Sequence, residues 1–240
     1  MSDESRGVAR REQLRSGLRA VRERIDAARL AAGRDDPVDL VVVTKTFPAT
    51  DVEILAGLGV TDVGENRDQE ASAKRADCAR TAPGLRWHMI GRLQRNKAAS
   101  VARWADVVES VDRPELITPL ARAAAGAGRS LDILVQVSLD QPPRPGRGGA
   151  DPSIVVDLAR QVAGEPDLRL SGVMGVAPFP GDPDEAFARL EAVAEEVRRQ
   201  WPEARRISAG MSGDLEAAIR HGATQVRIGG AVLGQRPSVQ

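Results

Sequence analysis

Lys45 is the residue of this chain whose type and position point most directly to chemistry. The chain has 34 Lys and Arg residues, of which only Lys45, Lys74 and Lys97 are lysines, and Lys45 ends the buried-strand pattern PVDLVVVTK. Arginine keeps its charge, whereas a partly buried lysine can lose its proton and attack a carbonyl to form a Schiff base. The first expectation is therefore an aldehyde cofactor on Lys45.

Two glycine-containing segments near the C-terminal end supply a second chemical signal. In ISAGMSGDLEAAI a strand is expected to end at Ser208, with Ser212 capping the helix that follows. In VRIGGAVLG the last strand is expected to end at Gly229 and Gly230, directly before a short helix. Free amides at a helix N-terminus bind anions, and glycine lets the backbone approach a ligand closely. Together the two turns predict a phosphate cradle.

These residues need elements that bring them to one place. Short β-branched runs alternate with helical patterns, and the expected strands are 39–45, 61–65, 86–91, 106–110, 131–138, 169–176, 205–208 and 225–229. Eight strands with helices between them favour a (β/α)8 TIM barrel over an open doubly wound sheet, and no glycine-rich nucleotide loop follows the first strand. An amphipathic helix over 1–34 is expected to pack on this barrel, giving one domain over 1–240.

The strand ends of a TIM barrel meet at its carboxyl-terminal mouth, which places Lys45 and both glycine turns on one face. By alternation Lys45 shares a strand face with Val41 and Val43, so we expect its amine above an apolar layer that lowers its pKa. An amine beside a phosphate cradle predicts pyridoxal 5′-phosphate (PLP), an aldehyde that carries a phosphate. Barrel aldolases place their lysine later, typically on the sixth strand, and this chain has no lysine after Lys97.

Other local patterns are less decisive. His88 either faces the cofactor ring or is a hydrogen-bonded core residue, and Asn66 either reaches a ligand or caps the next helix. The run Thr50–Glu53 (TDVE) predicts a capping box. The Pro- and Gly-rich run 140–151 predicts a flexible loop on the functional face.

Composition excludes several classes of function. Lys plus Arg equals Asp plus Glu, 34 each, so no nucleic-acid partner is expected. No apolar run of about 18 residues and no signal-peptide core are present, which predicts a cytoplasmic protein without a membrane partner. The single cysteine, Cys78, excludes an internal disulfide and a multi-cysteine zinc site, and we expect no bound metal.

Six motifs carry a family resemblance: VTK, GENRDQEA, WHMIGRLQRNK, SGVMG, ISAGMSGDLEAAI and VRIGGAVLG, in order over about residues 38–235. On these motifs the chain resembles the YggS/PROSC family of pyridoxal phosphate homeostasis proteins. The resemblance implies one barrel of the alanine racemase N-terminal domain type (PLP fold type III), with PLP as a Schiff base on Lys45. It also implies that Arg227 lies against the pyridine nitrogen, keeps it unprotonated and so makes the ring a weak electron sink.

The same resemblance implies the remaining cofactor contacts. Phosphate is expected at Met211, Ser212, Gly229 and Gly230, with Asn66, His88 and Ser208 completing the site. Three positions depart from the usual family pattern: Gly230 replaces Thr, Ala209 replaces Met, and the loop 140–149 replaces an Asn/Glu/Lys-containing stretch. Loss of the Thr hydroxyl removes one phosphate hydrogen bond, worth about 1–3 kcal/mol for a charged group.

Two functions compete. The first is a PLP-binding protein of vitamin B6 homeostasis that holds and releases the cofactor without catalytic turnover. The alternative is a PLP-dependent amino-acid racemase. The related racemases resemble a two-base design with a lysine and a tyrosine from a second domain, and this sequence has no tyrosine and ends at Gln240. We therefore expect the non-catalytic function, in a monomer, with PLP and PLP-requiring apoenzymes as partners.

Overall fold

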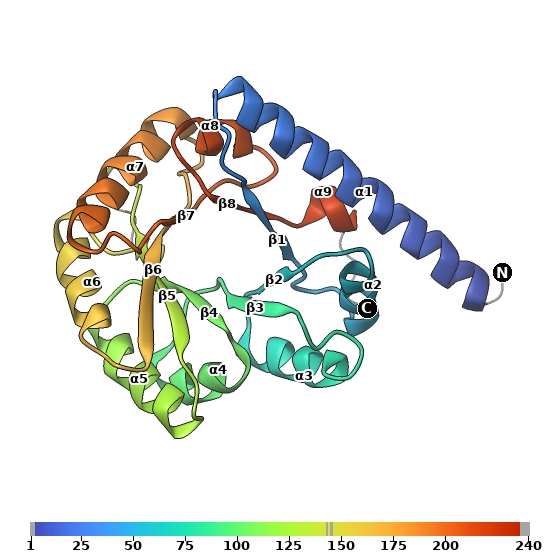
Figure 1. Cartoon of the computed structure of the whole chain (residues 1–240), viewed down its shortest axis with the longest axis horizontal. Coiled ribbons are helices and arrows are strands. Elements are labelled where there is room, and N and C mark those ends of the chain that lie inside the picture. The colour runs from blue at the N-terminus through green and yellow to red at the C-terminus, as the bar shows by residue number, and fades with distance from the viewer. Residues whose placement is uncertain (1–2, 143, 145, 236–240) are drawn as a thin grey trace.

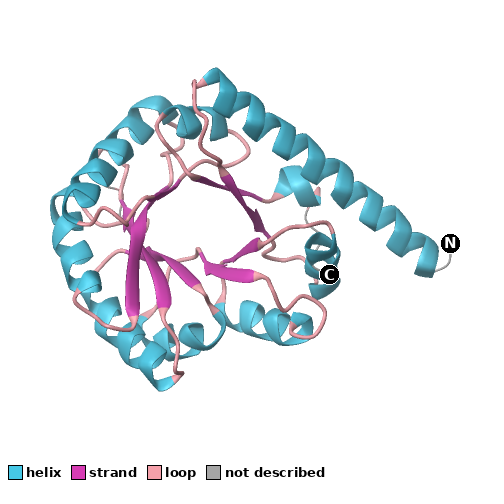
Figure 2. Cartoon of the chain, in the orientation of Figure 1, coloured by secondary structure: helices cyan, strands magenta, loops and turns pink. Residues whose placement is uncertain are grey.

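The protein folds into a closed eight-stranded parallel barrel surrounded by helices (Figure 1, Figure 2). The structure, a computed structural model, describes residues 3–142, 144 and 146–235. The strands lie in chain order around the barrel, and β1 pairs with β8 to close it. They are β1 (Asp39–Val43), β2 (Asp62–Glu65), β3 (Arg86–Met89), β4 (Val107–Val111), β5 (Leu131–Val137), β6 (Leu168–Gly175), β7 (Arg206–Ser208) and β8 (Gln225–Ile228). The predicted TIM barrel is confirmed, and each strand begins and ends within two residues of its prediction.

Helices follow the strands and cover the outside of the barrel. They are α1 (Asp3–Ala31), α2 (Ala49–Gly57), α3 (Asp68–Cys78), α4 (Ala98–Trp104), α5 (Ile117–Gly126), α6 (Val155–Ala163), α7 (Pro183–Gln200), α8 (Leu215–Arg220) and α9 (Gly230–Leu233), with short 3-10 turns at Arg95–Lys97, Pro114–Leu116 and Pro152–Ile154. The main apolar core lies between strands and helices and includes Val42, Val63 and Val226. A smaller cluster of Val107, Leu134 and Met174 is separate from it. Because successive strand residues point to opposite faces, this smaller cluster fills part of the barrel interior.

The predicted N-terminal helix is present as α1, which lies across the outside of the barrel next to α8 and α9 (Figure 1). Its buried stripe is Leu14, Leu18, Val21 and Ile25, at most 4% exposed. Gly17 lies on this helix where a Cβ atom would stand 2.5 Å from the carbonyl oxygen of Val232 in α9, so only glycine allows this close approach. Among the described residues no helix has the length and apolar character needed to cross a membrane.

Two predicted helix caps are wrong. Helix α2 begins at Ala49, so Thr50 lies inside the helix, and Asp51 instead binds Arg10 of α1 at 2.6 Å. Helix α8 begins at Leu215, with Asp214 rather than Ser212 in the N-cap position. Thr50 lies one residue after the start of α2, and Ser212 lies three residues before the start of α8.

The two ends of the loop after β5 are held by hydrogen bonds and an ion pair. Ala150 forms a parallel bridge with Val137 of β5, and its N–H donates to the Gln136 carbonyl at 2.8 Å. Arg147 binds the buried Asp140 at 3.2 Å. Pro143 and Pro145, part of the loop predicted to be flexible, lie outside the described residues.

Candidate functional site

Lys45 lies at the carboxyl-terminal mouth of the barrel. Lys45 was expected to be the last residue of the first strand. Strand β1 ends at Val43 instead, and Lys45 is the second residue of the turn that follows. The N–H of Phe47 closes this turn on the carbonyl of Thr44 at 3.1 Å. Val42 packs in the outer core, so Val41 and Val43 face the barrel interior below the half-buried Lys45.

The two glycine turns lie at the same mouth, after β7 and β8. The N–H of Met211 donates a hydrogen bond to the carboxylate of Asp214 at 2.6 Å. In the described part of the chain the N–H groups of Ser212 and Gly213 have no acceptor, and both residues are exposed. Gly229 stands beside β1, since a Cβ atom there would be 3.2 Å from the carbonyl oxygen of Val43. The turn at Gly229 and the turn at Lys45 are therefore neighbours, since β1 and β8 are paired.

Arg227 is a buried cation on the inner face of β8, only 5% exposed. Its guanidinium donates to Ser208 Oγ at 2.6 Å and to the carbonyl of Gly175 at 2.9 Å, and it lies 3.8 Å from the carboxylate of Glu109. Burial lowers the pKa of Arg227, while the nearby Glu109 opposes that change. An arginine retains its proton under such conditions, so the site has a fixed positive charge at the end of β8.

His88 is a fully buried residue that lies between two carboxylates. Its Nδ1 is 2.6 Å from Glu109 and its Nε2 is 2.8 Å from Asp62. Burial opposes a charge on the fully buried imidazole, but hydrogen bonds to Asp62 and Glu109 outweigh it and raise the pKa of His88. The geometry corresponds to the hydrogen-bonded core residue, the second of the two alternatives that the sequence left open. A contact between His88 and a cofactor ring stays a prediction.

Glu109 joins His88 to the mouth, and the sequence analysis missed it. Its carboxylate accepts hydrogen bonds from Ser208 Oγ at 2.6 Å and Gln225 Nε2 at 2.7 Å, besides His88. Burial would raise the pKa of Glu109, yet His88 and Arg227 lower it. The available signal was an acidic residue at an inward position of the apolar run VVESV. Ser208, a predicted site residue, is thus bound to both Arg227 and Glu109.

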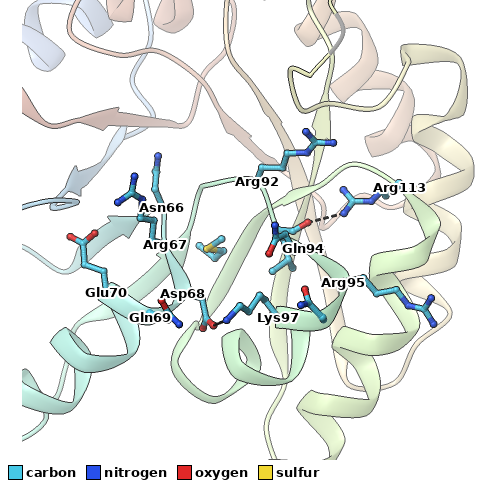
Figure 3. A pocket seen from close by; sticks show the side chains of 13 residues that line it. Asn66, Arg67, Asp68, Gln69, Glu70, Arg92, Gln94, Arg95, Lys97 and Arg113 are labelled. Atoms are coloured by element: carbon cyan, nitrogen blue, oxygen red, sulfur yellow. Dashed lines mark hydrogen bonds and ion pairs between the residues drawn. The ribbon is translucent and has the colours of Figure 1, made fainter.

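Beside the mouth lies a groove of about 990 Å³ between the β2–α3 and β3–α4 connections (Figure 3). Asn66 lines it and caps no helix, because the N-cap position of α3 is held by Arg67. Five cationic side chains and two acidic ones line this groove: Arg67, Arg92, Arg95, Lys97, Arg113, Asp68 and Glu70. The excess of positive charge makes the groove attractive to anions.

Comparison with known proteins identifies the family. A family model described as the N-terminal domain of alanine racemase matches residues 17–237. The pyridoxal phosphate homeostasis protein of Mycobacterium tuberculosis is 47% identical, over 95% of this chain and 94% of the relative. The chain belongs to the pyridoxal phosphate homeostasis family. The resemblance predicted from the six motifs is thereby confirmed.

Solved structures agree with this assignment. PipY of Synechococcus elongatus, a structure with PLP bound, is 30% identical with a TM-score of 0.78, covering 92% of this family member and all of PipY. Alanine racemase of Clostridium difficile is 14% identical with a TM-score of 0.70, and the match spans 57% of its length. The second likeness shows the fold alone.

Proposed function

We propose that this protein binds PLP at the carboxyl-terminal mouth of the barrel and acts in PLP homeostasis, with Lys45 as the covalent attachment point. The observation that carries the proposal is the meeting at one mouth of Lys45, the buried Arg227 and the two glycine turns. The family assignment and the PLP-bound relative PipY support it.

The donor set fits such a cofactor. PLP supplies an aldehyde, which condenses with a primary amine with loss of one water. The unpaired amides of Ser212 and Gly213 and the first turn of α9 at Gly230 offer N–H donors to a phosphate. Met211 shares this cradle, although its own amide is held by Asp214. The aldehyde and the phosphate of the ligand thus each have a suitable partner on this face.

The charge at Arg227 supports a role without catalytic turnover. A permanently protonated guanidinium donates hydrogen bonds and cannot deliver a proton to a ring nitrogen. The acidic group nearest to it, Glu109, is already bound by Ser208, Gln225 and His88. Arg227 would therefore hold a ring nitrogen unprotonated, and a bound ring would withdraw electrons only weakly from a reacting carbon.

The test is the absorbance spectrum of purified protein incubated with PLP, compared between wild type and Lys45→Ala. We expect the absorbance band of the lysine adduct in the wild type alone. Borohydride reduction followed by peptide mapping should label Lys45. Label on Lys74 or Lys97 would refute the assignment.

The racemase alternative is tested by incubating the PLP-loaded protein with L- or D-alanine. We expect no exchange of enantiomers, because the sequence contains no tyrosine to serve as the second base of the two-base design. Turnover that depends on Lys45 would refute the non-catalytic proposal.

Two further parts of the proposal concern partners. We propose that the protein is a monomer that passes PLP to apoenzymes that require it. Sedimentation of loaded and unloaded protein tests the first part. Activation of a PLP-depleted apoenzyme, compared between loaded protein and free PLP at the same concentration, tests the second.

A further inference from the structure

We propose that Lys74, Glu65 and Glu70 form a positioning unit that fixes the turn carrying Lys45. This inference rests on the proposed function, because it concerns the residue that would hold PLP. The sequence analysis assigned no role to any of these three side chains. They come from the end of β2 and from α3, and they contact the turn on both sides of Lys45.

The first contact holds the residue before Lys45. The ammonium of Lys74 donates to the carbonyl of Thr44 at 2.9 Å. The hydroxyl of Thr44 in turn donates to Glu65 Oε1 at 2.7 Å. Thr44 is therefore bound through its backbone and its side chain, and its rotation would break both contacts.

The second contact holds the residue after Lys45. Thr46 has φ +70°, a left-handed conformation that costs a β-branched residue free energy. Its N–H donates to Glu70 Oε1 at 2.5 Å. Because that hydrogen bond exists only while the amide points at α3, Glu70 holds Thr46 in the conformation that its own side chain disfavours.

Lys74 joins the two contacts. Its ammonium donates to Glu65 Oε1 at 2.6 Å and to Glu70 Oε1 at 3.1 Å, in addition to the carbonyl of Thr44. Three acceptors match the three donors of an ammonium group. A planar guanidinium cannot spread its donors in this way, which explains why a chain so rich in arginine has a lysine here.

The cluster is costly to bury, which argues for a specific role. Glu65 is fully buried and Lys74 is 5% exposed. Within the described residues Glu65 Oε2 has no hydrogen-bond partner, and burial raises the pKa of this carboxyl despite the opposing Lys74. Apolar side chains of similar volume often replace a buried ion pair at no cost in stability. They could not hold the amide of Thr46 or the carbonyl of Thr44.

The experiment compares PLP dissociation constants of Glu70→Ala and Glu70→Gln with the wild type. Alanine removes the acceptor for Thr46, so we expect the dissociation constant to rise on the order of tenfold, the effect of losing a hydrogen bond to a charged group. Glutamine keeps an oxygen acceptor and should stay within about threefold. Asp77→Ala, an exposed acidic residue on the same helix, is the matched control.

A second substitution separates positioning from general destabilisation. Asparagine adopts left-handed φ more readily than threonine. The double variant Glu70→Ala/Thr46→Asn should therefore recover most of the lost affinity, although it restores no contact with α3. Lys74→Arg should lose affinity like Glu70→Ala, because its planar donors do not reach all three acceptors.

The outcomes distinguish this inference from the proposed function. If Glu70→Ala binds PLP like the wild type, or if Thr46→Asn fails to rescue it, the positioning role is refuted. If Lys45→Ala keeps full affinity and the adduct band, the proposed function itself is refuted. An equal fall in thermal stability in Glu70→Ala and in the double variant, with no recovery of affinity in the double variant, would indicate a merely structural cluster.

Discussion

Arg24 of α1 donates a hydrogen bond to the carbonyl oxygen of Ser212 at 2.7 Å, across 188 positions of sequence. The same guanidinium binds both carboxylate oxygens of Glu216 in α8 at 2.5 and 2.6 Å. Arg10 of the same helix donates to the carbonyl of Leu233 in α9 at 3.1 Å. Helix α1 therefore contacts the turn at Ser212 directly, and it contacts the last residue of α9, the helix that follows the second glycine turn.

Replacement of Arg24 by alanine tests this support. We expect the PLP dissociation constant to rise several-fold, because the Ser212 turn loses its contact with α1. The change in the free energy of unfolding should stay within about 1 kcal/mol, since the ion pair is partly exposed to solvent. Arg19→Ala, which removes an exposed pair with Glu23 on the same helix, is the control. Equal effects of the two variants on affinity would contradict the prediction.

Gly230→Thr should strengthen PLP binding. A Cβ atom at Gly230 would meet no atom within 4 Å, and its φ is not in the left-handed region, so threonine fits. Its hydroxyl adds one donor at the cradle, and we expect affinity to rise about tenfold. Titration of PLP measures the change, with Gly230→Ala as the control that adds a methyl group without a hydroxyl. An equal gain in both variants would show that the hydroxyl is not the cause.

Stability should fall above neutral pH because of His88. Its folded pKa is raised, so its stabilising charge is fully present below the unfolded value of 6.5 and is lost as pH rises through the folded value. Glu109 has a lowered pKa, so its contribution is present above its unfolded value of 4.5 and is lost as pH falls through the folded value. Urea unfolding measured as a function of pH should show the highest stability between the unfolded values of 4.5 and 6.5, where both contributions are present.

Asp62→Asn gives the discriminating variant for this pH dependence. Removing one of the two anions that bind His88 lowers its folded pKa, so the alkaline loss of stability should be smaller and should be complete at a lower pH than in the wild type. His88→Gln should abolish that loss if the variant folds. An unchanged alkaline limb in Asp62→Asn would show that another group controls it.

The groove beside the mouth should speed PLP association at low salt. Its excess of cations attracts a phosphate dianion, and that attraction is screened within about 10 Å at 0.1 M salt. Stopped-flow absorbance should show a lower association rate for Arg67→Ala and Arg95→Ala, with a weaker salt dependence. Arg205→Ala removes the same charge directly before β7, at the opposite end of the barrel, and should leave the rate unchanged.

The sequence predicted the barrel and the residues at its mouth because both depend on local pattern. β-branched runs such as DLVVV and LDILVQV indicate strands by themselves, and their alternation with helices dictates where the strand ends meet. Lys45 and Gly229 could be placed near the mouth from their position at strand ends, whereas Arg227 was singled out only through the family resemblance.

The parts that could not be predicted depend on contacts between distant segments. The local pattern placed Asp51 in a capping box. In the structure its carboxylate binds Arg10, which is 41 positions away in the sequence. No sequence pattern assigned a role to Lys74, and its contact with the carbonyl of Thr44 follows only from how α3 packs on β2. For His88 the pattern allowed a core position but could not name its two carboxylate partners.

The contacts of α1 and β1 with the last elements of the barrel also bear on biosynthesis. A ribosome makes residues 10–45 first and residues 211–233 last, yet the proposed ligand site needs both. A growing polypeptide would therefore have Lys45 but not yet the two glycine turns. It could not retain the cofactor until its last strand has been synthesised and has left the ribosome. Loading with PLP would then report that translation of the barrel has been completed.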